Sequence, residues 1–183
     1  MSNEEYEKDK FLPYWAQRWP ACLPLLEFLN ANFKEIFAKY AMVCELGCGL
    51  GIMSAFLSSK NITTIATDIS LDSCKYAFAN IRNHSTKDRV VCADWRTSPF
   101  TARFDAIVAS DVLYEQRWVD PIIHFIYSGL NPGGFALIAD PCRNWWNGFK
   151  KAAIAAGFIV LVVNTSHINN NKTCVEIIRL QKH

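Results

Sequence analysis

A glycine-rich loop is the first feature of this sequence that could hold a cofactor. The segment Glu45–Gly51, with the sequence ELGCGLG, follows an apolar run and opens a stretch of helical character. Glycines at such a place let the backbone approach a bound cofactor closely. Dinucleotide enzymes have a similar loop, but their third glycine comes one position later, where this chain has Ile52. The spacing therefore favours a nucleotide-like ligand of another kind.

Acidic side chains close the next two apolar runs. Asp68 lies 17 residues beyond Gly51, where a carboxylate can accept hydrogen bonds from both hydroxyls of a ribose. Asp94 precedes Trp95, which places an acceptor for an adenine amino group beside an aromatic surface. Considered alone, Asp68 could also be a helix N-cap, and Asp94 could be an ordinary surface residue. Three successive strand ends with these side chains favour one adenosine-binding site.

The elements that must position these residues follow from the hydrophobic pattern. Short β-rich runs alternate with helical stretches, which is typical of βαβ units with a parallel sheet covered on both faces. The last two runs leave no room for a helix between them, so they predict an antiparallel hairpin. We therefore expect an α/β fold, a Rossmann-like doubly wound seven-stranded sheet. The predicted strands are Met42–Leu46, Thr63–Thr67, Arg89–Ala93, Phe104–Ser110, Phe135–Ala139, Phe158–Thr165 and Thr173–Leu180, and the crossover helices are Gly51–Ser59, Leu71–Asn83, Trp118–Leu130 and Trp145–Ala156.

The N-terminal part differs from this repeating pattern. Apolar residues at helical spacing predict an amphipathic helix over residues 21–38, and the aromatic segment Pro13–Pro20 precedes it. We expect residues 1–40 to cover the active site and residues 41–183 to form the core of a single domain.

Composition restricts the classes of protein that fit. No stretch reaches the ~18 consecutive apolar residues of a membrane span, and the charged start of the chain argues against a signal peptide. A cytoplasmic protein is expected. The net charge of +2 comes without a basic block, so nucleic acid is not indicated as a partner. The seven cysteines contain no Cys-x-x-Cys pair and are interpreted as reduced thiols, with no metal site.

The chain resembles the class I, seven-stranded S-adenosylmethionine-dependent methyltransferases from Pro13 to Leu180, and Glu45–Gly51 is similar to their first motif. The resemblance implies S-adenosylmethionine as cofactor and S-adenosylhomocysteine as its product. It assigns the methionine part to the first motif, the ribose to Asp68, and the adenine to Asp94 with Trp95. The full predicted set of cofactor-binding residues is Trp19, Glu45, Gly47, Cys48, Gly49, Gly51, Asp68, Ile69, Asp94, Trp95 and Ser110.

A narrower resemblance starts from Ala109–Tyr114, with the sequence ASDVLY, which is similar to the Asp-x-x-Tyr motif of seven-stranded protein lysine methyltransferases. The segments Pro13–Pro20 and Asp140–Arg143 resemble the electron-transfer-flavoprotein β-subunit lysine methyltransferases and their bacterial relatives. The chain departs from them at Ala21–Cys22, where two glycines are usual, and at Cys142, where glycine is usual.

With this resemblance, Asp111 and Tyr114 are the predicted catalytic residues. A carboxylate is some six pKa units too weak to take a proton from lysine outright, so Asp111 is expected to orient the amine and stabilise positive charge. Tyr114 would form an aromatic wall for a methylammonium group. The alternatives are a helix cap for Asp111 and a packing role for Tyr114. Arg143 fits either an acidic substrate group or a surface salt bridge.

The leading hypothesis is therefore an N-methyltransferase acting on a protein lysine. A small-molecule N-methyltransferase and a non-catalytic protein that binds the cofactor are the alternatives. The sequence leaves the oligomeric state open and is compatible with a monomer.

Overall fold

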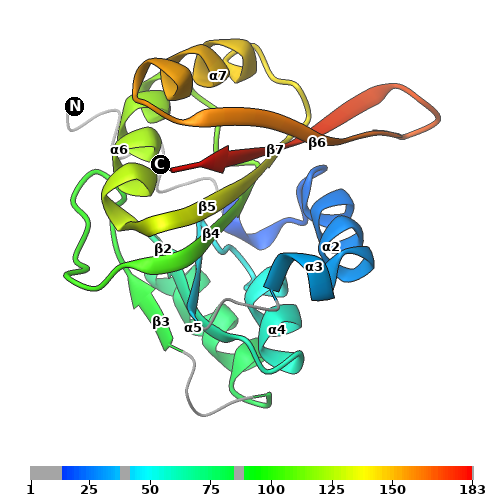
Figure 1. Ribbon diagram of the computed structural model, residues 1–183. Helices are drawn as coiled ribbons and strands as arrows, with labels where there is room; N and C mark the ends of the chain where they lie inside the picture. Colours follow the sequence, from blue (N-terminus) through cyan, green and yellow to red (C-terminus); the bar gives the residue numbers. More distant parts are fainter. Residues whose placement is uncertain (1–13, 38–41, 85–88, 183) are drawn as a thin grey trace, which may run out of the picture.

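A single seven-stranded sheet forms the centre of the computed structural model, which describes residues 14–37, 42–84 and 89–182. The strand order is β3-β2-β1-β4-β5-β7-β6 (Figure 1). Neighbours from β3 to β5 pair in parallel, whereas β7 pairs antiparallel with both β5 and β6. The strands are β1 (Met42–Leu46), β2 (Thr63–Asp68), β3 (Arg89–Cys92), β4 (Phe104–Ser110), β5 (Leu130–Asp140), β6 (Ile159–Ile168) and β7 (Thr173–Gln181).

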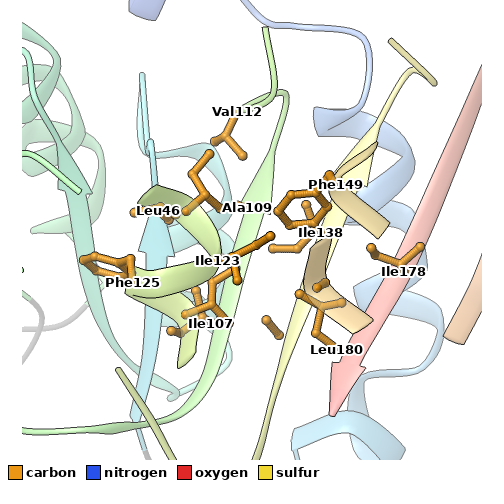
Figure 2. Close-up of a cluster of buried hydrophobic side chains, with 14 of the residues drawn as sticks. Leu46, Ile107, Ala109, Val112, Ile123, Phe125, Ile138, Phe149, Ile178 and Leu180 are labelled. Atoms are coloured by element: carbon orange, nitrogen blue, oxygen red, sulfur yellow. The ribbon is translucent and has the colours of Figure 1, made fainter. Parts of the chain in front are cut away.

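Helices cover both faces of this sheet because successive residues of a buried strand point to opposite sides. In β4, Ala106 and Val108 share a core cluster with α2, α3 and α4, whereas Ile107 and Ala109 share the other with α6 and α7. Figure 2 shows part of the second cluster. The helices are η1 (Tyr14–Ala16), α2 (Cys22–Ala31), α3 (Phe33–Phe37), α4 (Ile52–Ser59), α5 (Leu71–Ile81), η2 (Gln116–Trp118), α6 (Val119–Gly129) and α7 (Trp146–Ala155).

The fold class predicted from the sequence is confirmed, and the differences are local. The helix predicted over residues 21–38 is two helices, because Asn32 ends α2: its backbone N–H and its side-chain amide both bond to the carbonyl of Phe28. The last residue of the predicted helix, residue 38, lies outside the described residues. Strand β6 runs three residues further than predicted, to Ile168. The turn that follows has three consecutive asparagines at positive φ, a backbone region that asparagine tolerates better than most residues.

The N-terminal helix α2 packs directly on the sheet. Leu25 and Leu29 of α2 are fully buried, in the same cluster as Val43 of β1 and Phe135 of β5. Within the described residues, no helix is long and apolar enough to cross a membrane.

Candidate cofactor and transfer site

The glycine loop after β1 adopts a backbone that other residues tolerate poorly. Gly47 and Gly51 have φ values of 67° and 72°. A Cβ on Gly47 would lie 2.9 Å from a methyl group of Val112, and one on Gly51 would lie 2.7 Å from Cβ of Ala77 in α5. The loop is therefore compact, and its glycines are required by conformation as well as by space.

Glu45 lies behind this loop rather than on its surface. Its carboxylate is buried and accepts hydrogen bonds from the backbone N–H of Ser54, at 2.8 Å, and from the Ser54 hydroxyl. Burial raises the pKa of Glu45 to about 7. The contact joins β1 to the first turn of α4, and Cys48 is likewise buried beneath the loop.

Asp68 closes β2 and supports the glycine loop from the side. Its Oδ2 accepts from the backbone N–H of Gly49 and its Oδ1 from that of Ser70, both at 2.9 Å. Each carboxylate oxygen can accept a further bond, so these contacts leave capacity for ribose hydroxyls. Ile69, the next residue, is exposed.

Asp94 and Trp95 follow the end of β3 and have different partners. Asp94 is held by Arg96, whose Nε donates to Oδ2 at 2.8 Å. Partial burial opposes ionisation, but the Arg96 hydrogen bonds and charge lower the pKa of Asp94 below its ordinary value. The Trp95 ring packs edge-on against Trp118 at 5.2 Å and lies 3.3 Å from where a Cβ on Gly47 would be.

Asp111 occupies a strained and buried position after β4. Its φ is 61°, and its side chain is only 3% exposed. Oδ2 accepts from the backbone N–H of Ala21 and Oδ1 from Nη2 of Arg143, both at 2.8 Å. The carboxylate therefore joins the end of β4 to the residue before α2 and to the turn after β5.

Arg143 is shared between two carboxylates. Its Nη1 donates to Oδ2 of Asp140 at 2.8 Å, and its backbone N–H donates to Oδ1 of the same residue at 2.7 Å. Burial raises the pKa of both carboxyls, and the Arg143 guanidinium opposes that shift. The sequence left two roles open for Arg143, and here its partly exposed guanidinium makes an ion pair with two buried carboxylates. Asp140 had no role in the sequence analysis, although its strand-end position could have suggested one.

Aromatic side chains from the N-terminal segment lie over the end of β4. Tyr114 is 42% exposed, and its ring stacks on Tyr14 with centroids 6.0 Å apart. Trp19 donates from Nε1 to the carbonyl of Tyr14 at 2.6 Å and lies 6.0 Å from the Arg143 guanidinium. An open groove of about 610 Å³ starts beside this group, lined by Tyr114, Glu115, Gln116, Arg117 and Trp145.

Most of the predicted residues fall into two adjoining groups. The loop, Asp68 and Trp95 form the first, and Trp19, Asp111 and Tyr114 form the second, with Arg143. Asp94 pairs with Arg96 instead. The close approach of Val112 to Gly47 joins the two groups. Ser110, the last residue of β4, is half-buried beside Asp111. The described residues contain no group of three or more His, Cys, Asp or Glu side chains arranged to hold a metal ion.

The sheet order and the loop after β1 define a Rossmann-like methyltransferase fold. Residues 14–173 match the family described as a methyltransferase domain, and the chain belongs to that family. The protein-lysine methyltransferase METTL21E of Bos taurus is 29% identical over an alignment of 122 residues, and the match covers 60% of this chain and 41% of that protein. The chain thus matches less than half the length of this relative.

Two solved structures illustrate the shared fold. The magnesium protoporphyrin IX methyltransferase of Synechocystis PCC 6803, with bound S-adenosylmethionine, has a TM-score of 0.74 at 13% identity and covers 100% of this chain and 98% of its own. The N-methyltransferase NodS of Bradyrhizobium japonicum WM9, in complex with S-adenosylhomocysteine, has a TM-score of 0.70 at 15% identity, with 86% of each chain covered.

Proposed function

We propose that this methyltransferase uses S-adenosylmethionine to methylate the side-chain amine of a lysine in a protein. The observation that carries the proposal is the position of Asp111 and Tyr114 just after β4, where Val112 between them lies close to Gly47 of the glycine loop. The name of the Bos taurus relative supports a protein lysine as acceptor.

The residues at the ends of β1, β2 and β3 fit this cofactor. The loop from Gly47 to Gly51 would bring backbone close to its methionine part, and Asp68 has acceptor capacity left that could bind the ribose. Trp95 offers an aromatic surface beside the loop. When bound, the cofactor supplies a methyl group already activated by a sulfonium, so no Lewis acid is required for transfer.

The site would act on the acceptor amine through electrostatic interactions rather than through a strong base. Presenting lysine as a neutral amine at pH 7 costs about 4.6 kcal/mol, because its ordinary pKa is about 10.4. When both are ionised, Asp111 and Asp140 share the single positive charge of Arg143, which leaves one net negative charge under the site. The amine would react only after its proton has passed to solvent. The negative charge would then orient the neutral amine and stabilise the cationic product.

Tyr114 would hold the alkyl-ammonium end of the acceptor. Its ring is exposed at the rim of the open groove and already stacks on Tyr14. A cation over such a ring gains about 0.5 to 2 kcal/mol. The groove beyond it is open to solvent, which suits the surface of a protein substrate.

The deciding experiment supplies methyl-labelled S-adenosylmethionine and the purified protein to a lysate separated into a protein and a small-molecule fraction. We expect label in the protein fraction, recovered as methyl-lysine after acid hydrolysis, and less of it by roughly tenfold or more with the Asp111→Asn variant. Label in small molecules only would identify a small-molecule N-methyltransferase. Cofactor binding without transfer to either fraction would favour the non-catalytic alternative.

A further inference from the structure

Cys142 and Cys174 lie side by side although they are 32 residues apart in the sequence. Their Sγ atoms are 3.6 Å apart, and Cys142 is exposed to solvent whereas Cys174 is half-buried. All seven cysteines are free thiols in this structure. The pair therefore combines solvent access with a partner thiol already in place.

The strand register explains why the two thiols meet. In the antiparallel ladder between β5 and β7, Phe135 pairs with Gln181 and Asp140 pairs with Glu176. Continuing that register by two residues beyond Asp140 places Cys142 opposite Cys174. The ladder itself ends at Asp140, and Cys142 lies just past its end, where its Sγ comes within 3.6 Å of Sγ of Cys174.

The backbone at Cys142 is unusual for cysteine. Its φ is 56°, in the left-handed region that glycine and asparagine adopt more readily. This conformation places the Cys142 side chain on β7 while the next residue, Arg143, bonds to Asp140 and Asp111. The dithiol and the ion-pair network thus share one turn.

We propose that Cys142 and Cys174 form a reversible disulfide that serves as a redox modification site beside the transfer site. A metal would need further ligands, and none of the described residues completes such a group. The oxidant is a low-molecular-weight disulfide such as glutathione disulfide.

The exchange proceeds in two steps that balance. Burial raises the pKa of Cys142, so its thiol must first lose its proton; the thiolate then attacks one sulfur of glutathione disulfide, which releases one glutathione and leaves a mixed disulfide on Cys142. The Cys174 sulfur, after losing its proton, then attacks the Cys142 sulfur and displaces the second glutathione. The two protein thiols are oxidised to a disulfide, and glutathione disulfide is reduced to two thiols. The sulfurs must come about 1.5 Å closer, from 3.6 Å to about 2.05 Å, through side-chain rotation together with movement of the turn.

The direct test incubates the intact protein with glutathione disulfide, blocks the remaining thiols and digests with trypsin. The expected product is a cross-link between residues 118–143 and residues 173–179, with alkylatable thiols falling from seven to five. Cys142→Ser and Cys174→Ser should each abolish this product, whereas Cys92→Ser should leave it intact. Because the disulfide constrains the unfolded chain, the oxidised protein should also show a higher Tm than the reduced one.

Failure to form that cross-link, with Cys142 remaining as the glutathione mixed disulfide or a different cysteine pair bridged, would overturn the assignment. This result needs no enzymatic activity, so it is separable from failure of the proposed function. A Cys142→Gly variant also relieves the positive φ and should fold at least as well as the wild type, so loss of the cross-link there cannot be attributed to unfolding.

A consequence for turnover rests on the proposed function. Because the turn that shifts carries Arg143, we expect cross-linking to lower turnover roughly tenfold, since displacements of about 1 Å near a site have large effects. Dithiothreitol should restore it, and the Cys142→Ser variant should not respond to the oxidant. Unchanged turnover in fully cross-linked protein would show that the disulfide is not coupled to the site.

Discussion

The guanidinium of Arg143 donates to Asp111 at 2.8 Å and so joins the ends of β4 and β5 across the site. A second arm of the same guanidinium binds the fully buried Asp140. Among the described contacts, Arg143 is therefore the cationic partner of both carboxylates.

Replacing Arg143 with Ala should lower the free energy of unfolding by about 3 to 5 kcal/mol, because it leaves buried carboxylates without their positive charge. Urea unfolding followed by circular dichroism measures the loss. The matched control is Lys75→Ala, which removes a pair with Asp72 on the solvent-exposed face of α5 and should barely change the midpoint. Equal effects of the two variants would contradict the role of the buried pair.

Asp111→Asn should preserve cofactor affinity while turnover falls by roughly tenfold or more, because the amide keeps the shape but removes the charge. Asparagine also tolerates the positive φ at this position. Calorimetry with S-adenosylhomocysteine and a transfer assay must both be run. Normal turnover would make Asp111 a purely structural residue, and lost cofactor binding would place it with the cofactor residues.

Asp68→Ala should weaken S-adenosylhomocysteine binding by roughly 10- to 100-fold, since hydrogen bonds to a charged group contribute about 1.5 to 3 kcal/mol. The affected contacts are those expected to the ribose, together with the support that Asp68 gives to Gly49. Asp72→Ala, at an exposed acid in the first turn of α5, is the control and should leave Kd unchanged. Unchanged affinity in the Asp68 variant would remove it from the site.

Glu45 predicts a pH dependence of stability. Its pKa rises from an ordinary 4.5 to about 7 in the folded protein because the carboxyl is buried. Between these values the folded state binds more protons than the unfolded state, so this residue's contribution to the free energy of unfolding falls as pH rises from 4.5 to about 7. The total loss is about 3 kcal/mol.

Glu45→Gln should remove that loss. The free energies of unfolding of wild type and variant should therefore change with pH in the same way only above pH 7. Unfolding free energies measured across this window test the sign, with the exposed Glu27→Gln as the control that keeps the wild-type slope. A wild-type slope in the Glu45 variant would contradict the assignment.

Gly51→Ala should destabilise the fold by at least 1 kcal/mol, because the new Cβ would meet Ala77 at 2.7 Å and the backbone is left-handed there. The matched control is Gly148→Ala in α7, where a Cβ meets nothing within 4 Å. That change should stabilise by about 0.5 to 1 kcal/mol because alanine favours the helix. Thermal unfolding separates the two, and a tolerated Gly51→Ala would argue against a tightly packed loop.

The sequence alone determined the fold class and most of the elements. The run Phe104–Ser110 is apolar apart from Asp105 and its last residue, which predicts a strand covered on both faces, and that strand has the predicted bounds. The loop Glu45–Gly51 was found because its glycines and its place after a strand are local features. Arg96, two residues from Asp94, could also have been predicted as its partner, since that contact is local.

The tertiary structure decided which distant residues meet. Asp111 contacts Ala21, 90 residues away, and Arg143, 32 residues away. Cys142 meets Cys174 through the β5–β7 register. These contacts depend on strand order, on register and on where the N-terminal segment packs, and those result from burial of the whole sheet. The hydrophobic pattern assigns each strand its faces, but its neighbours are chosen only when all strands and helices pack together.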